Sequence, residues 1–317
     1  MAAGSQAVTR LAWPALVAAL ACGCATVRPA SARLAETRRL FEARRFSAAA
    51  ARLTAPELQK LRSNELPRAY ELLGRSQEAL GTPDLALRTY QLAVALFPRD
   101  LPLLTQLGNL LYRSGLDGQA RPYYERILKI HPNNAAAHFG LAETERRLGF
   151  LDRAEAHYEA TLKDWGDQPD IWRDYAEVLG DRGRLERALQ AIGRSLELAD
   201  RPQARVDQAR LLWKAGRRPE AFASLARAQG LEPQRLDLVQ QQALWQLETG
   251  DLPAVQAACE KILVKRAGDP LALWLRASVA LRHGRPSEAV KDLELATRQG
   301  EAPFVAAAAA SLLKSLR

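Results

Sequence analysis

Residues 101–134 read LPLLTQLGNLLYRSGLDGQARPYYERILKIHPNN, and Gly115 divides this stretch into two amphipathic halves. Apolar residues recur at three- and four-residue spacing in each half, which predicts two helices that each have one apolar face. These residues are Leu103, Leu104, Leu107, Leu110 and Leu111, then Ala120, Tyr123, Tyr124, Ile127 and Leu128. Pro132 and Asn133 are typical of the end of the second helix. A pair this small cannot bury both faces alone, so we expect it to pack on neighbouring copies.

The stretch is one copy of a repeat whose turn glycines are separated by 33 or 34 residues: Gly81, Gly115, Gly149, Gly183, Gly216, Gly250 and Gly284. Seven residues before each stands a small residue, namely Gly74, Gly108, Ala142, Ala176, Ala209, Ala243 or Ala277. Five residues after each stands Ala86, Ala120, Ala154, Ala188, Ala221, Val255 or Ala289. Nine residues after each stands Tyr90, Tyr124, Tyr158, Ile192, Leu225, Cys259 or Leu293. Small residues at the first two positions let the paired helices approach closely, so we expect bulkier side chains there to be rejected.

This pattern resembles the tetratricopeptide repeat. The resemblance implies an all-α fold, a right-handed superhelical solenoid of helix-turn-helix repeats. We expect seven repeats over residues 67–301 and a capping helix over 302–317, packed through Ala306 to Ala310 on the last repeat. Residues 32–66 are interpreted as a degenerate first repeat or an N-terminal cap, since terminal repeats are atypical.

The first 23 residues have the parts of a secretory signal. Arg10 precedes the uncharged run LAWPALVAALA, residues 11–21, which is too short to span a bilayer. Small residues and two cysteines follow, and the segment resembles a bacterial lipoprotein signal peptide. That resemblance implies removal of residues 1–23, lipidation of Cys24, with Cys22 as the alternative, and a tether over residues 24–31. The absence of Asp after either cysteine implies attachment to the outer membrane, facing the periplasm. An ordinary signal peptide or an N-terminal anchor is the other interpretation.

The formal charge of +9 comes from 45 Lys and Arg against 36 Asp and Glu. Such a balance favours nucleic acid, anionic lipid or acidic partners. The basic residues are interleaved with acids in every repeat, so we expect solvated helix faces and no basic patch. The same holds for Arg33, Arg38, Arg39, Arg44 and Arg45, with contact to anionic headgroups as the alternative. Without a basic stripe, and with a secretion signal, we expect no nucleic-acid binding.

Motifs that carry catalysis or bind a metal are absent from the sequence. None of His131, His138, His157 and His283 stands at a metal-ligand spacing, and no GxSxG, Walker or GxGxxG motif occurs. Cys259 falls at an apolar helical position and is expected to be a small buried hydrophobe. We therefore expect a non-catalytic protein without metal or cofactor.

Tetratricopeptide solenoids bind partners through the concave surface lined by the first helix of each repeat. The outward residues there are polar in the early repeats, for instance Arg173 and Glu177. In the later repeats more of the outward residues are apolar. The predicted groove residues are Tyr112 of an early repeat and, in the later repeats, Val206, Arg210, Trp213, Leu244, Leu247, Trp274 and Leu281. An exposed apolar patch commonly marks an interaction site. The hypothesis is a groove for an apolar or amphipathic segment, with Trp213 and Trp274 as anchors; the alternative is that packing buries these residues.

The predicted fold and the lipoprotein-like signal segment together predict a scaffold for protein partners in the cell envelope, attached to the outer membrane by an N-terminal lipid. The chain resembles the lipoproteins that help assemble pilus secretins and related secretion or motility machines. A general periplasmic adaptor for polysaccharide or cell-wall systems is the alternative, and an unrecognised enzyme is the least favoured interpretation.

Overall fold

The computed structural model describes residues 30–298 and 303–316, and every regular element within them is helical. Two compact units divide the chain, one ending at Leu148 and the other beginning at Gly149. The predicted signal segment, with Cys22 and Cys24, lies outside the described residues. Within those residues, no helix is both long and apolar enough to cross a membrane.

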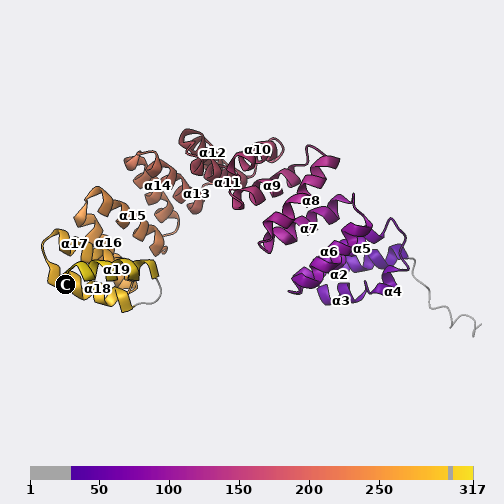
Figure 1. The fold of residues 1–317 in the computed structure, drawn as a ribbon, viewed down its shortest axis with the longest axis horizontal. Helices are drawn as coiled ribbons and strands as arrows, with labels where there is room; N and C mark the ends of the chain where they lie inside the picture. Colours follow the sequence, from indigo (N-terminus) through magenta and orange to yellow (C-terminus); the bar gives the residue numbers. More distant parts are fainter. Residues whose placement is uncertain (1–29, 299–302, 317) are drawn as a thin grey trace, which may run out of the picture. The chain divides into compact units, whose positions relative to one another are not determined.

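The N-terminal unit contains helices from α2 to α9 (Figure 1). Their bounds are α2 (Ala30–Glu42), α3 (Phe46–Ala51), α4 (Ala55–Leu58), α5 (Leu66–Ala79), α6 (Pro83–Leu96), α7 (Leu101–Arg113), α8 (Asp117–Ile130) and α9 (Ala135–Arg147). From α5 onward each helix packs on the next, and the first helices of neighbouring repeats, α5, α7 and α9, also contact one another. This is the packing of a tetratricopeptide solenoid.

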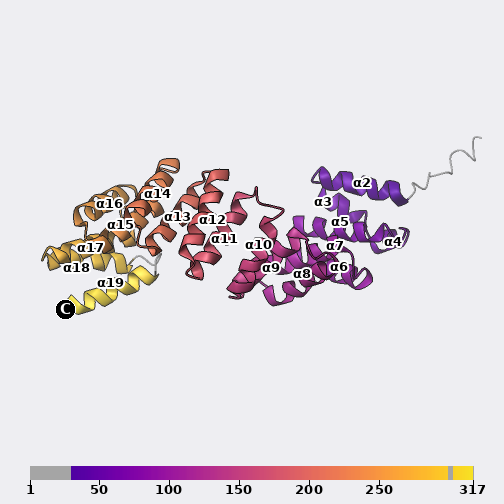
Figure 2. The same cartoon turned by 90° about the horizontal axis from the view of Figure 1, so that it is seen from above.

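The C-terminal unit contains helices from α10 to α19, arranged in the same way (Figure 2). Their bounds are α10 (Leu151–Leu162), α11 (Pro169–Asp181), α12 (Leu185–Leu198), α13 (Pro202–Lys214), α14 (Arg218–Leu231), α15 (Leu236–Thr249), α16 (Leu252–Lys265), α17 (Pro270–Arg282), α18 (Pro286–Arg298) and α19 (Pro303–Leu316). The first helices α11 and α13 contact each other, as do α15 and α17.

The seven turn glycines confirm the predicted repeat. All of them have φ between +71° and +83°, between the first and second helix of a repeat. A side chain is disfavoured in this left-handed conformation, so the turn favours Gly.

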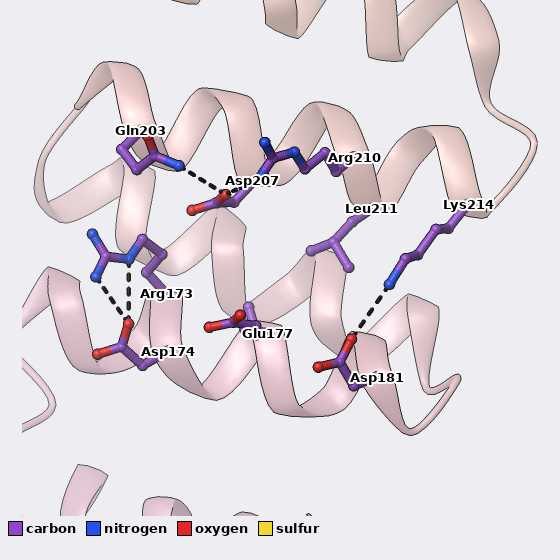
Figure 3. Close-up of a pocket in the computed structure, with 10 residues that line it drawn as sticks. Arg173, Asp174, Glu177, Asp181, Gln203, Asp207, Arg210, Leu211 and Lys214 are labelled. Atoms are coloured by element: carbon purple, nitrogen blue, oxygen red, sulfur yellow. Dashed lines mark hydrogen bonds and ion pairs between the residues drawn. The ribbon is translucent and has the colours of Figure 1, made fainter. Parts of the chain in front are cut away.

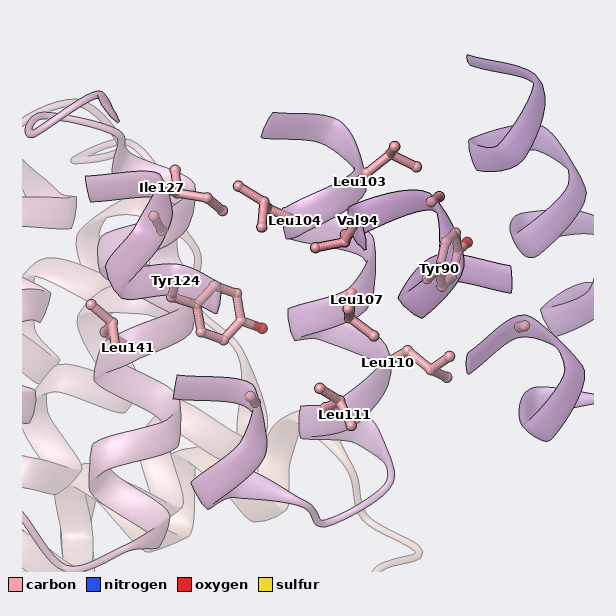
Figure 4. Packing of buried hydrophobic residues seen from close by; sticks show 14 residues of the cluster. Tyr90, Val94, Leu103, Leu104, Leu107, Leu110, Leu111, Tyr124, Ile127 and Leu141 are labelled. Atoms are coloured by element: carbon pink, nitrogen blue, oxygen red, sulfur yellow. The ribbon is translucent and has the colours of Figure 1, made fainter. Parts of the chain in front are cut away.

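The predicted small and large positions also meet in the core. Gly74 faces the ring of Tyr90, where an added Cβ would lie 2.3 Å from a ring carbon. Tyr124 is enclosed in the same way by Gly108 and Gly140, at 2.9 and 2.5 Å. The leucines of α7 fill the space between the two tyrosines (Figure 4). Close helix approach therefore depends on the small residues, as expected.

Helices α2 and α3 keep the spacing of a repeat around an unusual turn. Arg44 occupies the turn position with φ +57°, the one described non-Gly residue with positive φ. Thr37, Ala49 and Leu53, at the same offsets from Arg44 as the repeat residues from their Gly, are all buried. This geometry favours a degenerate repeat over an unrelated cap.

Helix α19 packs on α17 and α18, but its contact differs from the one expected. Ala309 is buried and the half-buried Leu312 and Leu313 join it in the core. Ala307, Ala308 and Ala310 are exposed. The contact is narrower than a run of five alanines because successive helical residues point to different sides.

Candidate protein-binding surface

The first helices α11 and α13 lie side by side and leave an open pocket of about 450 Å³ between their outward faces (Figure 3). Its lining residues are Arg173, Asp174, Ala176, Glu177 and Asp181 of α11, and Gln203, Asp207, Arg210, Leu211 and Lys214 of α13. Most of these recur at three- or four-residue spacing and so form one polar stripe on each helix. The pocket lies within the C-terminal unit.

Charged side chains of both signs line this pocket and pair with one another. The Arg173 guanidinium donates to Asp174 at 2.9 Å, Gln203 Nε2 donates to Asp207 at 3.1 Å, and Arg210 Nη1 lies 3.5 Å from Asp207. Lys214 Nζ lies 3.4 Å from Asp181 and joins the two helices. A partner with complementary charges can replace the exposed Lys214–Asp181 pair at little cost, because exposed ion pairs are individually weak.

Small and apolar residues form the floor of the pocket. Ala176 and Leu211 are buried there. Gly180 brings α11 close to α13, since a Cβ at this position would lie 2.5 Å from a Leu211 methyl carbon. The floor is therefore fixed by helix packing, while the charged walls are free to exchange partners.

Burial raises the pKa of Asp207, although the Gln203 amide and the nearby cations Arg210 and Arg173 act in the opposite direction. A carboxyl group with a raised pKa binds its proton more tightly in the folded state. Protonation of Asp207 therefore adds to the stability of the fold as the pH falls through the folded-state pKa. Above that pKa the ionised Asp207 carboxylate lowers the stability.

We expect Asp207→Asn to preserve or raise stability at neutral pH and to remove this gain on acidification. Urea unfolding of the wild type and the variant between pH 7 and pH 4 measures the difference. The wild type should gain stability relative to the variant as pH falls. A relative loss would show that the cations, and not burial, dominate at Asp207. Asp200→Asn is the control: Arg205 lowers the pKa of Asp200, so the wild type should gain no stability over this variant between pH 7 and pH 4 and should lose stability relative to it below about pH 4.

The structure brings one predicted groove residue, Arg210, into the pocket. Val206 and Leu247 lie in the core, 2% and 9% exposed, so they cannot line a groove. Tyr112, in the N-terminal unit, is half-buried; its hydroxyl donates to Glu143 at 2.7 Å and Arg147 lies over its ring. Each of these three side chains serves packing in its own unit.

The predicted aromatic anchors also pack within the C-terminal unit. Trp213 is stacked on Trp245, with ring centroids 4.6 Å apart and planes 4° apart. The half-buried Leu244 and Trp274 pack on the core around Cys259, and Leu281 packs on the core beneath α18. Burial by packing therefore describes these residues better than an open apolar groove does. A partner role for their exposed edges stays a prediction.

The sequence marks Arg173 and Glu177 as outward and polar and Arg210 as a groove residue, but the other charged residues of the pocket were not predicted as a site. The sequence does contain a pattern that marks the charged residues of α13. Gln203, Asp207, Arg210 and Lys214 recur at helical spacing on one face of α13, which marks a polar stripe. A polar stripe is also what any solvated helix face shows, so the pattern by itself does not separate a pocket wall from ordinary surface.

Cys259 and two of the histidines named in the sequence analysis are buried or contact neighbouring residues. Cys259 is a free, buried thiol, as expected, and burial raises its pKa to about 12. The His138 ring lies 2.9 Å from the Pro132 carbonyl oxygen, and the His283 ring lies 3.1 Å from the Arg285 guanidinium. Over the described residues, no group of three or more His, Cys, Asp or Glu is arranged to hold a metal ion.

Comparison with known proteins agrees with this geometry. The sequence profile of the tetratricopeptide repeat matches residues 105–169 and 144–205. The fold is that of a tetratricopeptide repeat protein. Proteins of this fold generally act by binding other proteins. Comparison with curated protein sequences gives no match.

Several solved structures share the fold at low sequence identity. A tetratricopeptide repeat protein from Parabacteroides merdae has a TM-score of 0.59 and 20% identity, covering 79% of this chain and 98% of its own. PilF of Pseudomonas aeruginosa has a TM-score of 0.57 and 17% identity, covering 68% and 97%. MamA from Desulfovibrio magneticus, from residue 41 to its end, has a TM-score of 0.51 and 16% identity, covering 53% and 96%. At these identities the likeness concerns the fold alone.

Proposed function

We propose that the chain is a non-catalytic scaffold that binds a protein partner through the charged pocket between α11 and α13. The observation that carries the proposal is this pocket: a fixed, small-residue floor bordered by two stripes of charged side chains. Complementary charges give an interface its specificity and its rate of association. The partner is therefore a polar segment with charges of both signs, in place of the apolar segment expected from the sequence.

The proposed location is the periplasmic face of the bacterial outer membrane, where Cys24 or Cys22 carries the lipid. The signal-like segment and its cysteines support this part of the proposal. The proposed task is assembly of an envelope machine of the pilus, secretin or motility type.

Reversing two pocket charges tests the proposal. In the cells that make the protein, Glu177→Arg with Arg210→Glu should lower the partner recovered by crosslinking and affinity capture at least about tenfold, because like charges then meet across the interface. The control is Arg194→Glu with Glu197→Arg, which reverses an exposed ion pair on the second helix α12. Equal recovery from both variants would refute the pocket as the binding site.

The identity of the captured partner and of the lipidated cysteine test the remaining parts. Secretin or motility subunits would support the assembly task, whereas polysaccharide or cell-wall enzymes would support the adaptor alternative. Labelling with radioactive palmitate should be lost in Cys24→Ala or Cys22→Ala. A wild-type chain that takes up no label would refute the lipid anchor.

A further inference from the structure

The positive charge of the chain is concentrated near its N-terminus. Residues 30–62 contain eight Arg and Lys against three Glu, a net +5 out of the total of +9. Residues 63–317 contain 35 basic and 33 acidic residues, a net +2. Basic residues are numerous in the repeats but nearly neutralised there, and the first helices carry the surplus.

Three exposed arginines of this segment stand close together in sequence and are called the arginine turn: Arg39 in the last turn of α2, with Arg44 and Arg45 between α2 and α3. The three glutamates of the segment are already paired with other cations. Glu57 contacts Arg33 and Lys60, Glu36 contacts Arg52, and Glu42 contacts Arg38. Among the ion pairs of the described residues, none involves a member of the arginine turn. Its charge is therefore left to the solvent or to a ligand.

The backbone of the turn is strained for the residue it holds. Arg44 has φ +57°, while the seven turns of the later repeats have Gly in the same conformation. That conformation is disfavoured for residues with a side chain. The Arg44 side chain is exposed, so packing does not compensate for the strain. The turn needs the left-handed conformation but not an Arg, so the choice of Arg over Gly at this position suggests a function outside the fold.

We propose that the arginine turn binds the phosphate headgroups of an anionic membrane surface. The inference rests on the proposed lipid anchor for its location. Five residues separate Cys24 from α2 and span at most about 18 Å, and the 13 residues of α2 extend about 20 Å. An anchored chain thus keeps the arginine turn within reach of the bilayer. Guanidinium groups match phosphate geometry and remain charged at every relevant pH.

A membrane fits the arginine turn better than a single-stranded nucleic acid does. Single-stranded nucleic acids are bound by exposed aromatic rings beside basic residues. The aromatic residues nearest in sequence, Phe41 and Phe46, are half-buried and pack edge to face on each other, 5.3 Å apart. Arginines without exposed rings suit a surface that offers phosphates alone.

Partition between two vesicle types tests the inference in a chain that lacks the covalent lipid anchor. The full chain with Cys22→Ala and Cys24→Ala is sedimented with vesicles of phosphatidylcholine, either pure or with about one third phosphatidylglycerol. The readout is the ratio of the two partition coefficients. The apolar N-terminal segment contributes equally to both coefficients, so its contribution cancels in the ratio. Arg39→Gln, Arg44→Gly and Arg45→Gln together should lower the ratio roughly 100-fold, about fivefold for each arginine.

Two further sets of variants distinguish a localised site from a general effect of net charge. Arg88→Gln, Arg99→Gln and Arg227→Gln remove the same charge from exposed positions elsewhere, and should change the ratio less than threefold. An equal loss in this control would show that only net charge matters and would overturn the proposal. Arg44→Gly alone should raise the melting temperature and still lower the ratio about fivefold. An unchanged ratio would also overturn the proposal, as would a chain that binds duplex DNA and does not sediment with the vesicles. Failure of palmitate labelling would refute the anchor without altering the vesicle result.

Discussion

Trp245→Ala is expected to lower the free energy of unfolding of the C-terminal unit by about 3–5 kcal/mol, the usual cost of truncating a buried Trp. Trp245 is 6% exposed on α15. Its ring stacks on Trp213 of α13 and meets the edge of Phe222 of α14 at 6.1 Å. The truncation therefore leaves a cavity where three helices meet, and Trp213 and Phe222 keep only their contact with each other.

Urea unfolding followed by circular dichroism measures the loss. Phe304→Ala is the matched control, since Phe304 on α19 is 91% exposed and its truncation should change stability by no more than about 0.5 kcal/mol. A loss below about 1 kcal/mol for Trp245→Ala would contradict the stacked core. It would also restore the hypothesis that these aromatic residues form an open groove.

The same three rings show why the burial of predicted groove residues could not be predicted from the sequence. Apolar periodicity identifies the residues that avoid water, but it does not say whether a partner or a neighbouring helix covers them. The position of Trp213 in its repeat predicts an outward side chain. In the structure its ring packs on Phe222 of α14 and Trp245 of α15. That packing depends on the size of each neighbour, which a repeat pattern does not specify.

The turns were predictable because their cause is local. A left-handed residue between two helices favours Gly whatever surrounds it, so a regular series of Gly identifies the repeats. The turn at Arg44 was not predicted for the same reason, because nothing in its own residue type marks a turn. The charged pocket was partly visible as a helical stripe, but its floor depends on the approach of α11 to α13 at Gly180.

Gly74→Ala is expected to destabilise the N-terminal unit by about 1–3 kcal/mol, the typical cost of overpacking a core. The added methyl would lie 2.3 Å from a Tyr90 ring carbon, and Tyr90 is fully buried. The ring cannot move away easily, because its hydroxyl donates to Glu78 at 2.7 Å. Gly193→Ala is the control. Nothing lies within 4 Å of that methyl on α12, so helix propensity alone should stabilise this variant by about 0.5–1 kcal/mol.

A second substitution should rescue the first, because the methyl added at Gly74 meets the Tyr90 ring directly. In the N-terminal unit Gly74 and Gly108 face tyrosines. In the C-terminal unit alanines share core clusters with smaller residues, Ala209 with Leu225 and Ala277 with Leu293. Gly74→Ala should therefore cost less in a Tyr90→Leu background than in the wild type.

The double-mutant cycle measures this coupling as the difference between the double variant and the sum of the two single ones. We expect a favourable coupling of at least about 1 kcal/mol, within the range found for residues in direct contact. Additive effects would mean that the methyl group is accommodated by movement of the backbone of α5. In that case the choice between Gly and Ala at this position would reflect helix propensity and not the size of the residue that it faces.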